Sequence, residues 1–405
     1  MIENRDEVKT ALLVIPYEDV NDTALRMEEL EALVDTMGLK TLSGITFRIR
    51  EYSSATMLGS GQVEELKENI LFHGCDCVVF DTSLSPRILR NLEVALDCCV
   101  IDREEVILQI FADRAKTREA KLQVALARAE YSLPRLRRRW EDLSQQRGGV
   151  KGSRGAGERQ LELDRRALSE RITVLKREIE EVKKIRTVQR ASRSRGKTYS
   201  FALVGYTNAG KSSLLNLLTS SDILAEDRLF ATLDPTTRTM KLKNRVEVTV
   251  TDTVGFVSNL PHHLISAFSS TLEEAKYADT LIIVLDMANP AAEQCYETTL
   301  EVLENLGAAN SDRIVVFNKM DAVSSEIALS RLRVAVPDHI EISVRNRTGI
   351  GELTDAMWEK AVTGRSEKTF TLDPSDGKAL SELYRSYTVL STEYRDGMLE
   401  VRVLT

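Results

Sequence analysis

The sequence predicts an α/β protein in which a long helical hairpin joins two parts built of alternating strands and helices. Three observations support this prediction. Apolar runs alternate with amphipathic segments before residue 112 and again after residue 199, heptad seams occupy the segment between, and a glycine-rich loop lies directly between a strand and a helix. We therefore expect a small N-terminal α/β subdomain, an antiparallel helical hairpin and a larger α/β domain.

Strands and helices alternate through the first 112 residues. Apolar runs predict strands at 11–17, 45–49, 77–81 and 99–102. Amphipathic segments between them predict helices over 21–36, 62–72 and 86–96. Strands that alternate with helices of about 10–15 residues indicate a largely parallel sheet. We expect residues 1–112 to form an N-terminal α/β subdomain.

Five cysteines are too few for a disulfide framework in a chain of 405 residues. Four of them lie close together near His73, namely Cys75, Cys77, Cys98 and Cys99. A Cys-x-Cys pair beside a histidine suggests zinc, but the spacing differs from that of standard zinc sites and the cysteines flank strand-like runs. We interpret them as buried structural thiols.

Two heptad seams predict a pair of antiparallel helices over residues 113–190. The first seam has apolar side chains spaced alternately four and three residues apart, at Leu122, Leu126, Ala129, Leu133, Leu136, Trp140 and Leu143. The second seam has the same spacing, at Leu168, Ile172, Leu175, Ile179 and Val182. Each seam is too narrow to stabilise a lone helix, so the two are expected to cover each other. Pro134 removes one helical hydrogen bond and is expected to kink the first helix or split it.

A glycine-rich basic loop over residues 147–158 is predicted at the tip of this hairpin. A turn between two helices needs about 2–5 residues, whereas this segment is longer and contains five glycines. Glycines allow the backbone to approach a partner closely, and the interleaved cations suit phosphates. We predict RNA contacts from Arg147, Lys151, Arg154 and Arg159, with a merely flexible loop or a second nucleotide site as the alternatives.

The basic, Ser-rich segment 183–197 after the hairpin has no clear period and indicates a linker, which we place at 191–198.

Charge is unevenly distributed along the chain. The whole chain has 55 basic and 62 acidic residues, a net −7, but residues 101–200 contain 26 basic and 15 acidic residues. That window has +11, and the remainder has −18. An acidic protein is on average repelled by phosphate, yet this distribution favours one oriented approach to RNA, hairpin first.

A strand, a glycine-rich loop and a helix follow one another over residues 201–218. The loop contains Gly205-x-x-x-x-Gly210-Lys211-Ser212, the P-loop signature in its required setting. Its backbone amides point onto phosphates, aided by the helix N-terminus. Lys211 is expected to neutralise the β- and γ-phosphates, and Ser212 to bind Mg²⁺. The other nucleotide contacts expected from this loop are Tyr206, Thr207, Asn208 and Ala209.

A second strand ends in Asn318-Lys319-Met320-Asp321, with Asn318 107 residues after Lys211. In this pattern the aspartate carboxylate accepts two hydrogen bonds from guanine. Adenine lacks that donor pair and would leave a buried carboxylate unpaired, at a cost of about 1–3 kcal/mol or more. The pattern therefore predicts guanine nucleotides. A further strand end, expected to close over the base, supplies Ser343, Val344 and Arg345.

Two segments between these motifs are predicted to be switches. Asp252 ends an alternating strand and Gly255 follows, so the carboxylate is expected to reach the metal through water and the Gly255 amide to sense the γ-phosphate. Switch I is expected over 230–238, which has no helical or strand period. We choose Thr232 as its Mg²⁺ ligand and leave Thr236 and Thr237 as candidates. The further nucleotide contacts expected from both segments are Phe230, Ala231, Leu233, Asp234, Thr253 and Val254.

Lys211, Asp252 and Gly255 are the residues we assign to catalysis. Many GTPases place a glutamine directly after the switch II glycine to orient the attacking water, but here the residue is Phe256. A phenyl ring cannot orient water by hydrogen bonding, so we predict a GTPase with a slow intrinsic rate that a partner accelerates. One alternative is a non-catalytic, GTP-dependent RNA-binding or assembly factor. Another is a stress regulator that acts on proteins.

Taken together, these motifs resemble those of the HflX family of translational GTPases. The order GYTNAGKS, FATLDPTTR, DTVGF, NKMD and SVR, after RGAGERQLELDRR, is similar to that family's pattern, as are the earlier LSPRILRNLE and LPRLRRRW. The resemblance implies a Ras-like GTPase domain over 199–365, with GTP as substrate, Mg²⁺ as cofactor, and the nucleotide and metal residues named above. It also implies binding to the large (50S) ribosomal subunit, where the hairpin loop reaches ribosomal RNA, and an action on stalled or idle ribosomes, usually proposed to be splitting.

The resemblance extends to the end of the chain and includes two departures. Residues 366–405 resemble the small C-terminal extension of some members, with a helix over 377–387. Ala156 stands where the family commonly has proline, and Gln62 stands where a lysine is usual. The sequence contains no basic-then-apolar leader and no apolar run of about 18 residues. We therefore expect a cytoplasmic protein. We also expect it to be a monomer when bound to the ribosome.

Overall fold

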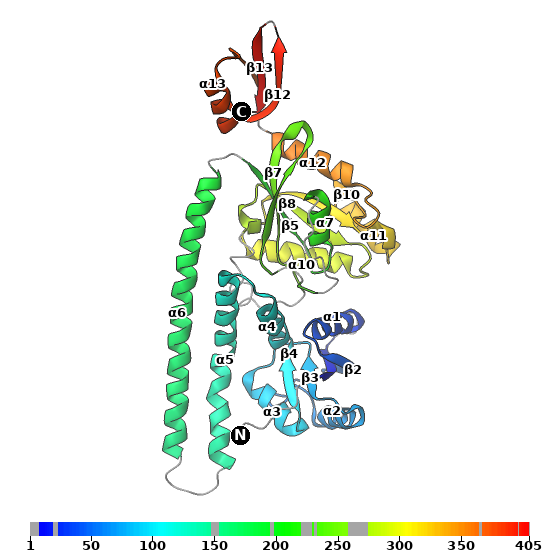
Figure 1. Ribbon diagram of the computed structural model, residues 1–405. Helices are drawn as coiled ribbons and strands as arrows, with labels where there is room; N and C mark the ends of the chain where they lie inside the picture. The colour runs from blue at the N-terminus through cyan, green and yellow to red at the C-terminus, as the bar shows by residue number, and fades with distance from the viewer. Residues whose placement is uncertain are drawn as a thin grey trace. The chain divides into compact units, whose positions relative to one another are not determined.

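The computed structural model divides into two compact units, which are residues Met1–Glu180 with Asn259–Phe268 and residues Glu181–Ser258 with Ser269–Thr405. Figure 1 shows the helices and strands of both units. The residues that the structure describes are 8–18, 23–146, 154–194, 198–219, 229–230, 233–257, 274–363, 367–395 and 397–404.

The first unit contains a parallel sheet of four strands in the order β2-β1-β3-β4. The strands are β1 (Thr10–Tyr17), β2 (Lys40–Arg48), β3 (Cys77–Phe80) and β4 (Cys99–Asp102). The helices are α1 (Thr23–Thr36), α2 (Ser60–His73), α3 (Pro86–Leu96) and α4 (Arg103–Arg114). The predicted alternation of strands and helices is confirmed, although β2 begins five residues before the strand predicted at 45–49.

Strand β1 lies inside the sheet and is buried because helices cover both of its faces. Its Leu12 and Val14 pack in one cluster with Leu66 of α2 and Leu92 of α3, and α1 packs against β1 and β2. Strands of a parallel sheet that are covered on both faces are apolar at consecutive positions. This is why the sequence shows an unbroken apolar run there instead of an alternating one.

The four clustered cysteines lie at the amino ends of β3 and β4. Cys75 and Cys77 are buried, Cys98 is half-buried and Cys99 is exposed, so the prediction of buried thiols is wrong for Cys99. Burial raises the pKa of Cys77 to about 12 and the pKa of Cys98 to about 11. Both thiols therefore stay protonated at neutral pH. Among the described residues, no group of three or more His, Cys, Asp or Glu side chains could hold a metal ion.

Helices α5 (Arg118–Gln146) and α6 (Arg154–Ser194) form the predicted hairpin. Leu126 of α5 packs with Leu175 and Ile179 of α6, at seam positions predicted from the sequence. Pro134 lies inside α5 without dividing it. A proline removes a single N–H donor, and the remaining hydrogen bonds of a 29-residue helix are sufficient to keep it continuous.

Helix α6 is longer at both ends than the sequence predicted. It begins at Arg154, inside the glycine-rich segment 147–158, and it ends at Ser194, four residues into the segment expected as a linker. Arg, Lys and Gln have high helix propensity, which compensates for the missing apolar period near its end. None of the helices in the described ranges is long and apolar enough to cross a membrane.

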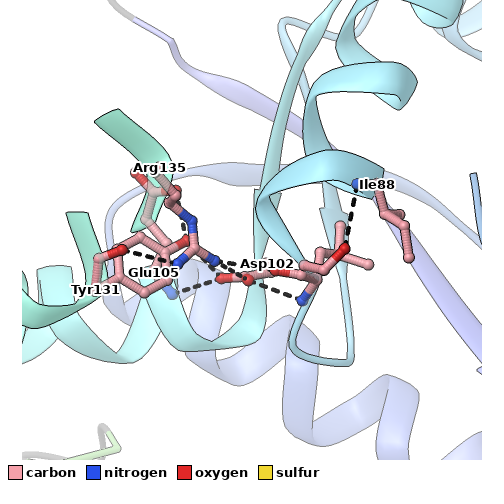
Figure 2. A network of polar contacts seen from close by, with 7 residues as sticks. Ile88, Asp102, Glu105, Tyr131 and Arg135 are labelled. Carbon is pink, nitrogen blue, oxygen red and sulfur yellow. Dashed lines mark hydrogen bonds and ion pairs between the residues drawn. The ribbon is translucent and has the colours of Figure 1, made fainter. Parts of the chain in front are cut away.

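A buried polar network joins α5 to the carboxyl end of β4, as Figure 2 shows. Asp102 accepts hydrogen bonds from Tyr131 Oη at 2.9 Å and from Arg135 Nη2 at 3.0 Å. Arg135 also donates to the main-chain oxygens of Tyr131 and Leu84, and its guanidinium carbon lies 3.3 Å from the centroid of the Tyr131 ring. Because Asp102 is fully buried, these contacts replace the hydration that its carboxylate loses on folding.

The second unit contains a six-stranded sheet in the order β10-β9-β8-β5-β7-β6, in which only the β6–β7 pair is antiparallel. The strands are β5 (Tyr199–Val204), β6 (Thr236–Lys241), β7 (Glu247–Asp252), β8 (Thr280–Asp286), β9 (Asp312–Asn318) and β10 (His339–Glu341). The helices are α7 (Lys211–Thr219), α10 (Ala292–Asn305), α11 (Glu326–Ala335) and α12 (Ile350–Val362).

The carboxyl ends of the parallel strands β5, β7, β8 and β9 lie at one edge of this sheet. Open α/β sheets bind their ligands at this edge. The P-loop follows β5, Asp252 ends β7, and Asn318 ends β9. The sheet topology therefore brings together three motifs that are spread over more than 100 residues of the chain.

A small antiparallel sheet lies at the end of the chain, with the strand order β11-β13-β12. Its elements are β11 (Glu367–Leu372), α13 (Gly377–Ser386), β12 (Thr388–Arg395) and β13 (Met398–Leu404). Leu383 of α13 packs with Val401 and Val403 of β13. The expected α+β character of this extension is confirmed.

The substitution Arg135→Met is expected to lower the free energy of unfolding of the first unit by about 3 kcal/mol, because the buried Asp102 carboxylate loses its arginine partner. Amide hydrogen exchange of β4 in the full chain measures this loss. The matched control is Arg166→Met, since Arg166 and Glu170 form an exposed pair one helical turn apart, worth about 0.3–0.5 kcal/mol. Equal losses in the two variants would show that the network does not stabilise this unit.

Candidate active site

The P-loop keeps its conformation through close backbone packing at two glycines. Gly205 has a φ of 143°, and a Cβ at this position would lie 2.3 Å from the carbonyl oxygen of Val284. Gly210 has a φ of 92°, and a Cβ there would lie 2.4 Å from Asn318 Nδ2. A larger residue at either position would displace β8 or Asn318, which explains why the motif requires glycine at both.

Lys211 begins α7 and is only 6% exposed. Its ammonium group donates to the carbonyl oxygens of Gly205 at 3.0 Å and Tyr206 at 2.7 Å. Burial lowers the pKa of Lys211 to about 8, with the charge of Asp252 acting in the opposite direction. A phosphate group beside this ammonium would favour the charged form and raise the pKa again. The position thus has the buried positive charge that a polyphosphate requires.

Ser212 and Asp252 place two oxygen atoms side by side next to Lys211. Ser212 Oγ donates to Asp252 Oδ2 at 2.6 Å, and Asp252 is fully buried at the end of β7. Hydroxyl and carboxylate oxygens are the kind of ligand that Mg²⁺ prefers. The residues present therefore fit the metal that the sequence predicts at this position.

The structure describes only part of switch I. Ala231 and Thr232 lie outside the described residues, and the prediction that 230–238 has no strand is wrong for residues 236–238, which belong to β6. They form a strand because they pair with β7, so that Thr236 lies opposite Asp252. Thr237 Oγ1 is hydrogen-bonded to Thr251 Oγ1 at 2.9 Å. Leu233 is buried and Asp234 is half-buried.

The start of switch II is paired with the P-loop backbone. The N–H of Phe256 donates to the Gly205 carbonyl at 3.1 Å, and the N–H of Thr207 donates to the Phe256 carbonyl at 2.7 Å. A Cβ on Gly255 would lie 2.6 Å from Thr207 Cα, so this approach requires glycine. Phe256 is 1% exposed. Its ring therefore lies in the interior and supplies no group that could orient a water molecule.

Residues next to this pairing are also hydrogen-bonded or buried. The N–H of Phe230 donates to Thr207 Oγ1 at 2.9 Å, and Thr253 Oγ1 donates to the Leu203 carbonyl at 2.7 Å. Thr253 and Val254 are buried. Asn208, the next residue of the P-loop, has a φ of 59°. Phe230 of switch I and Phe256 of switch II thus both bond to the P-loop.

Asn318 connects the P-loop to the segment that is expected to recognise guanine. Its Nδ2 donates to the Ala209 carbonyl at 2.8 Å, and its Oδ1 accepts from the N–H of Val344 at 3.3 Å. The sequence predicted a nucleotide contact at Asn318 but missed this connecting role. The bond joins residues 109 positions apart, and no local pattern could have indicated it.

Asp321 is oriented by Ser343 and Arg345. Ser343 Oγ donates to Asp321 Oδ1, and Arg345 Nη1 lies 4.0 Å from Asp321 Oδ2. The Ser343 hydrogen bond is the main cause of a lowered pKa for Asp321, and the Arg345 charge acts in the same direction. The carboxylate is therefore ionised at neutral pH, with the acceptor capacity that the two N–H groups of guanine require.

Lys319 extends along the same edge of the sheet. Its φ is 61°, and its Nζ donates to Asp286 Oδ2 at 2.7 Å, while the N–H of Met320 donates to the Ile342 carbonyl at 3.2 Å. Asp286 is a residue of the site that sequence reasoning missed. It ends β8, whose apolar sequence TLIIVLD indicates a buried strand and nothing more.

The predicted RNA contacts lie elsewhere in the chain. Arg147 and Lys151 lie outside the described residues, and Arg154 and Arg159 belong to α6. The structure thus places the P-loop, Asp252 and Asn318 at one sheet edge, while nucleotide binding and the RNA contacts of individual residues both remain predictions.

With a phosphate loop after one strand and a carboxylate suited to guanine after another, the second unit is the catalytic domain of a P-loop GTPase. Family comparisons agree with this class along the chain. Residues 24–112 match the family described as GTP-binding GTPase N-terminal, residues 114–193 match GTP-binding GTPase Middle Region, and residues 200–319 match 50S ribosome-binding GTPase.

Curated relatives identify the family. GTPase HflX of Treponema denticola is 54% identical to this chain, with 80% of this chain and 84% of that protein covered. GTPase HflX of Akkermansia muciniphila is 43% identical, with 99% and 95% covered, and that of Escherichia coli is 38% identical, with 95% and 90% covered. The chain therefore belongs to the HflX family of GTPases, and the resemblance predicted from the motifs is confirmed.

A solved structure supports the same fold. The crystal structure of SsGBP in complex with GDP is 27% identical to this chain and has a TM-score of 0.51. The similarity covers 88% of this chain and 99% of that one. The similarity extends over most of the chain, beyond the P-loop region.

The lowered pKa of Lys211 predicts a pH dependence of the stability of the nucleotide-free chain. Between its folded-state pKa of about 8 and its ordinary value of 10.5, the unfolded chain binds more protons, so the free energy of unfolding rises with pH in this window. Below pH 8 the lysine is charged and buried in the folded state, so the full desolvation penalty lowers the free energy of unfolding. From pH 8 to 10.5 this free energy is expected to rise by about 1–3 kcal/mol in the wild type. Lys211→Met should abolish this rise.

The measurement is the difference between the unfolding free energies of the wild-type chain and the Lys211→Met variant from pH 7 to pH 11. Groups other than Lys211 titrate equally in both proteins, so the difference isolates this lysine. If the two curves run parallel through the whole range, the buried lysine does not have the lowered pKa.

Proposed function

We propose that this GTPase binds GTP with Mg²⁺ at the carboxyl edge of the six-stranded sheet and that the GTP-bound form associates with the large ribosomal subunit, where it splits or rescues stalled or idle ribosomes. The observation that supports this most strongly is the match of residues 200–319 to the family described as 50S ribosome-binding GTPase. The identity to GTPase HflX proteins over nearly the whole chain adds to it.

In this proposal each part of the nucleotide meets a group of matching chemistry. The ammonium group of Lys211 and the amides of the P-loop neutralise the phosphates. The Asp321 carboxylate, held by Ser343, accepts the guanine N–H groups, and Arg345 covers the base. Ser212 and Thr232 would hold Mg²⁺, which supplies positive charge to the phosphates when bound.

Residues of both switches couple the nucleotide state to the partner. The N–H of Gly255 is the group we expect to detect the γ-phosphate, and Gly255 already lies against Thr207 of the P-loop. GTP would order switch I around Thr232 next to the same phosphate. Loss of the γ-phosphate on hydrolysis removes the acceptor that holds both segments, and the partner surface they form is lost with it.

The hairpin supplies the RNA-binding surface in this proposal. Residues 101–200 have an excess of 11 positive charges, and the predicted contacts at its tip are Arg147, Lys151, Arg154 and Arg159. Cations between glycines suit a phosphate backbone, because glycine permits close approach and each contacted phosphate releases counterions. The N-terminal region and the GTPase domain are acidic, so the tip would approach RNA first.

A second candidate function is supported by Phe256. Because this side chain is buried and cannot orient water, GTP could serve mainly as a structural ligand of an RNA-binding or ribosome-assembly factor. The two candidates differ in the effect of the partner on hydrolysis. Stimulated turnover supports the enzyme that cycles on the ribosome, and unstimulated turnover supports the assembly factor.

GTP turnover is expected to be slow for the isolated chain and to rise at least about tenfold with purified large subunits, because the partner supplies the organisation that Phe256 does not. Phosphate release under saturating GTP measures the rate. The Lys211→Met variant is the control for contaminating hydrolysis and is expected to show no stimulation. A turnover number that large subunits leave unchanged would contradict the prediction.

Neutralising the hairpin tip is expected to weaken binding to large subunits and to reduce its salt dependence. In the variant with Arg147, Lys151, Arg154 and Arg159 all changed to Gln, the slope of log K against log salt should fall by about 0.7–0.9 for each lost phosphate contact. Cosedimentation at several salt concentrations measures the slope. Splitting of whole ribosomes in the presence of GTP, followed by sucrose gradients, should fall in parallel.

A matched control removes the same number of charges elsewhere on α6. Arg165, Arg166, Arg171 and Arg177 are all exposed, and changing these four to Gln should leave the slope close to that of the wild type. If the slope falls equally in both variants, the overall positive charge of α6, and not the tip, determines the salt dependence of binding.

A further inference from the structure

Strand β12 contains an irregularity at Leu390. The register between β12 and β13 shifts between Val389 and Ser391, so Leu390 has no partner in the described ladder. Val389 packs into the small core of the C-terminal sheet, whereas Leu390 packs against the core of the GTPase domain. Successive side chains of a strand point to opposite faces, so these two neighbouring apolar residues pack into two different cores at the position of the bulge.

The core that Leu390 contacts includes the β6–β7 hairpin, by which we mean β6, the turn η2 (Lys243–Arg245) and β7. Strand β12 lies directly against η2. The side chains that this hairpin contributes to the core are Met240, Leu242, Val246, Val248 and Val250. The C-terminal sheet is thus attached to the hairpin at its turn.

The β6–β7 hairpin runs from this contact to the nucleotide site. Each strand has six residues and spans about 20 Å. At the far end Thr236 is paired with Asp252, and Asp252 accepts the hydrogen bond of Ser212. Strands of one ladder move together, because a change of register would change every cross-strand pair. Strand β7 is itself paired with β5 from Val248 to Asp252, whereas β6 is the edge strand. A displacement of the turn would therefore act mainly on β6 and move its Thr236 relative to the P-loop.

Within the GTPase domain the turn is closed by a hydrogen bond from the Leu242 N–H to the Val246 carbonyl at 2.9 Å, and both of these side chains are buried. Lys243 forms an ion pair with Asp355 of α12, but both side chains are about half exposed, and such pairs add little stability. Asn244 and Arg245 have left-handed φ values of 55° and 59°, so the turn has a defined but strained shape. Leu390 provides the apolar contact from outside the GTPase domain.

A hydroxyl group next to the bulge lacks a hydrogen bond within the described part of the chain. Ser391 Oγ, directly after Leu390, is buried and has no hydrogen-bond partner among the described residues. Buried polar groups without a partner are rare in natural structures and indicate that local geometry serves another purpose.

We propose that Leu390 is a positioning residue for GTP hydrolysis. By anchoring the turn of the β6–β7 hairpin, it fixes the edge strand β6, and with it Thr236, relative to the P-loop without touching the nucleotide. The C-terminal extension thereby acts on the chemistry of a site about 20 Å away. This role is independent of the ribosome and concerns the intrinsic reaction.

The test compares full-length variants at position 390 with a control on the same strand. For Leu390→Ala we expect the single-turnover rate of GTP hydrolysis at saturating GTP to fall about three- to tenfold, with the affinity for GDP changed by less than about twofold. Leu390→Met keeps the apolar contact and should retain the wild-type rate. Tyr394→Ala, which removes an exposed side chain of β12, should do the same.

Amide hydrogen exchange in the nucleotide-free chain provides the second readout. Amides of residues 240–250 should exchange several-fold faster in Leu390→Ala than in the wild type or in Tyr394→Ala, because the turn has lost its anchor. A merely structural role within the C-terminal sheet would accelerate exchange in β11 and β13 and leave the hairpin and the hydrolysis rate unchanged.

Three results would overturn the proposal. The first is a wild-type hydrolysis rate in Leu390→Ala, and the second is an equal fall of the rate in Tyr394→Ala. The third is a slower reaction without faster exchange in residues 240–250, which would exclude the route through the hairpin. If Leu390→Ala does not fold, Leu390→Val applies the same test with a smaller loss of packing, and its rate and exchange are judged by the same criteria.

Discussion

The hydrogen bonds of the Asn318 side-chain amide are the interactions on which the nucleotide site depends. The amide donates to the Ala209 carbonyl of the P-loop and accepts from Val344 in the segment that orients Asp321. The phosphate and guanine halves of the site are thereby held at a fixed separation. This bond also requires Gly210, because a side chain there would collide with the amide. The parallel order of β5, β8 and β9 makes the contact possible, since it brings the three strand ends to one edge.

The site contains groups that the folded chain would not keep for stability alone. Lys211 is buried against two carbonyl groups, and its pKa falls as a result. Asp252 is buried beside Ser212. Charges removed from water are tolerated when a ligand completes their environment. The nucleotide and its metal would supply this missing complement, so binding and stability of the second unit are coupled through the same few atoms.

Contacts outside the nucleotide site attach the peripheral modules. In the first unit, Asp102 at the end of β4 bonds Tyr131 and Arg135 and so attaches the middle of α5 to the sheet. In the second unit, the bulge at Leu390 attaches the C-terminal sheet to the turn between β6 and β7. The first contact is polar and buried, and the second is apolar and arises from a local irregularity. Each joins an appended element to the sheet of its own unit.

The sequence by itself determined the α/β class, the heptad seams, the P-loop and the guanine-selecting motif, because each is a contiguous pattern whose residues interact locally or with the ligand. Only the tertiary structure decided the connecting role of Asn318, the membership of Asp286 in the site, the interior position of Phe256 and the exposure of Cys99. It also showed that α6 continues into the expected loop and linker. These features depend on which strand ends become neighbours and which side chains fill the space between them, and both follow from packing between residues that are distant in the chain.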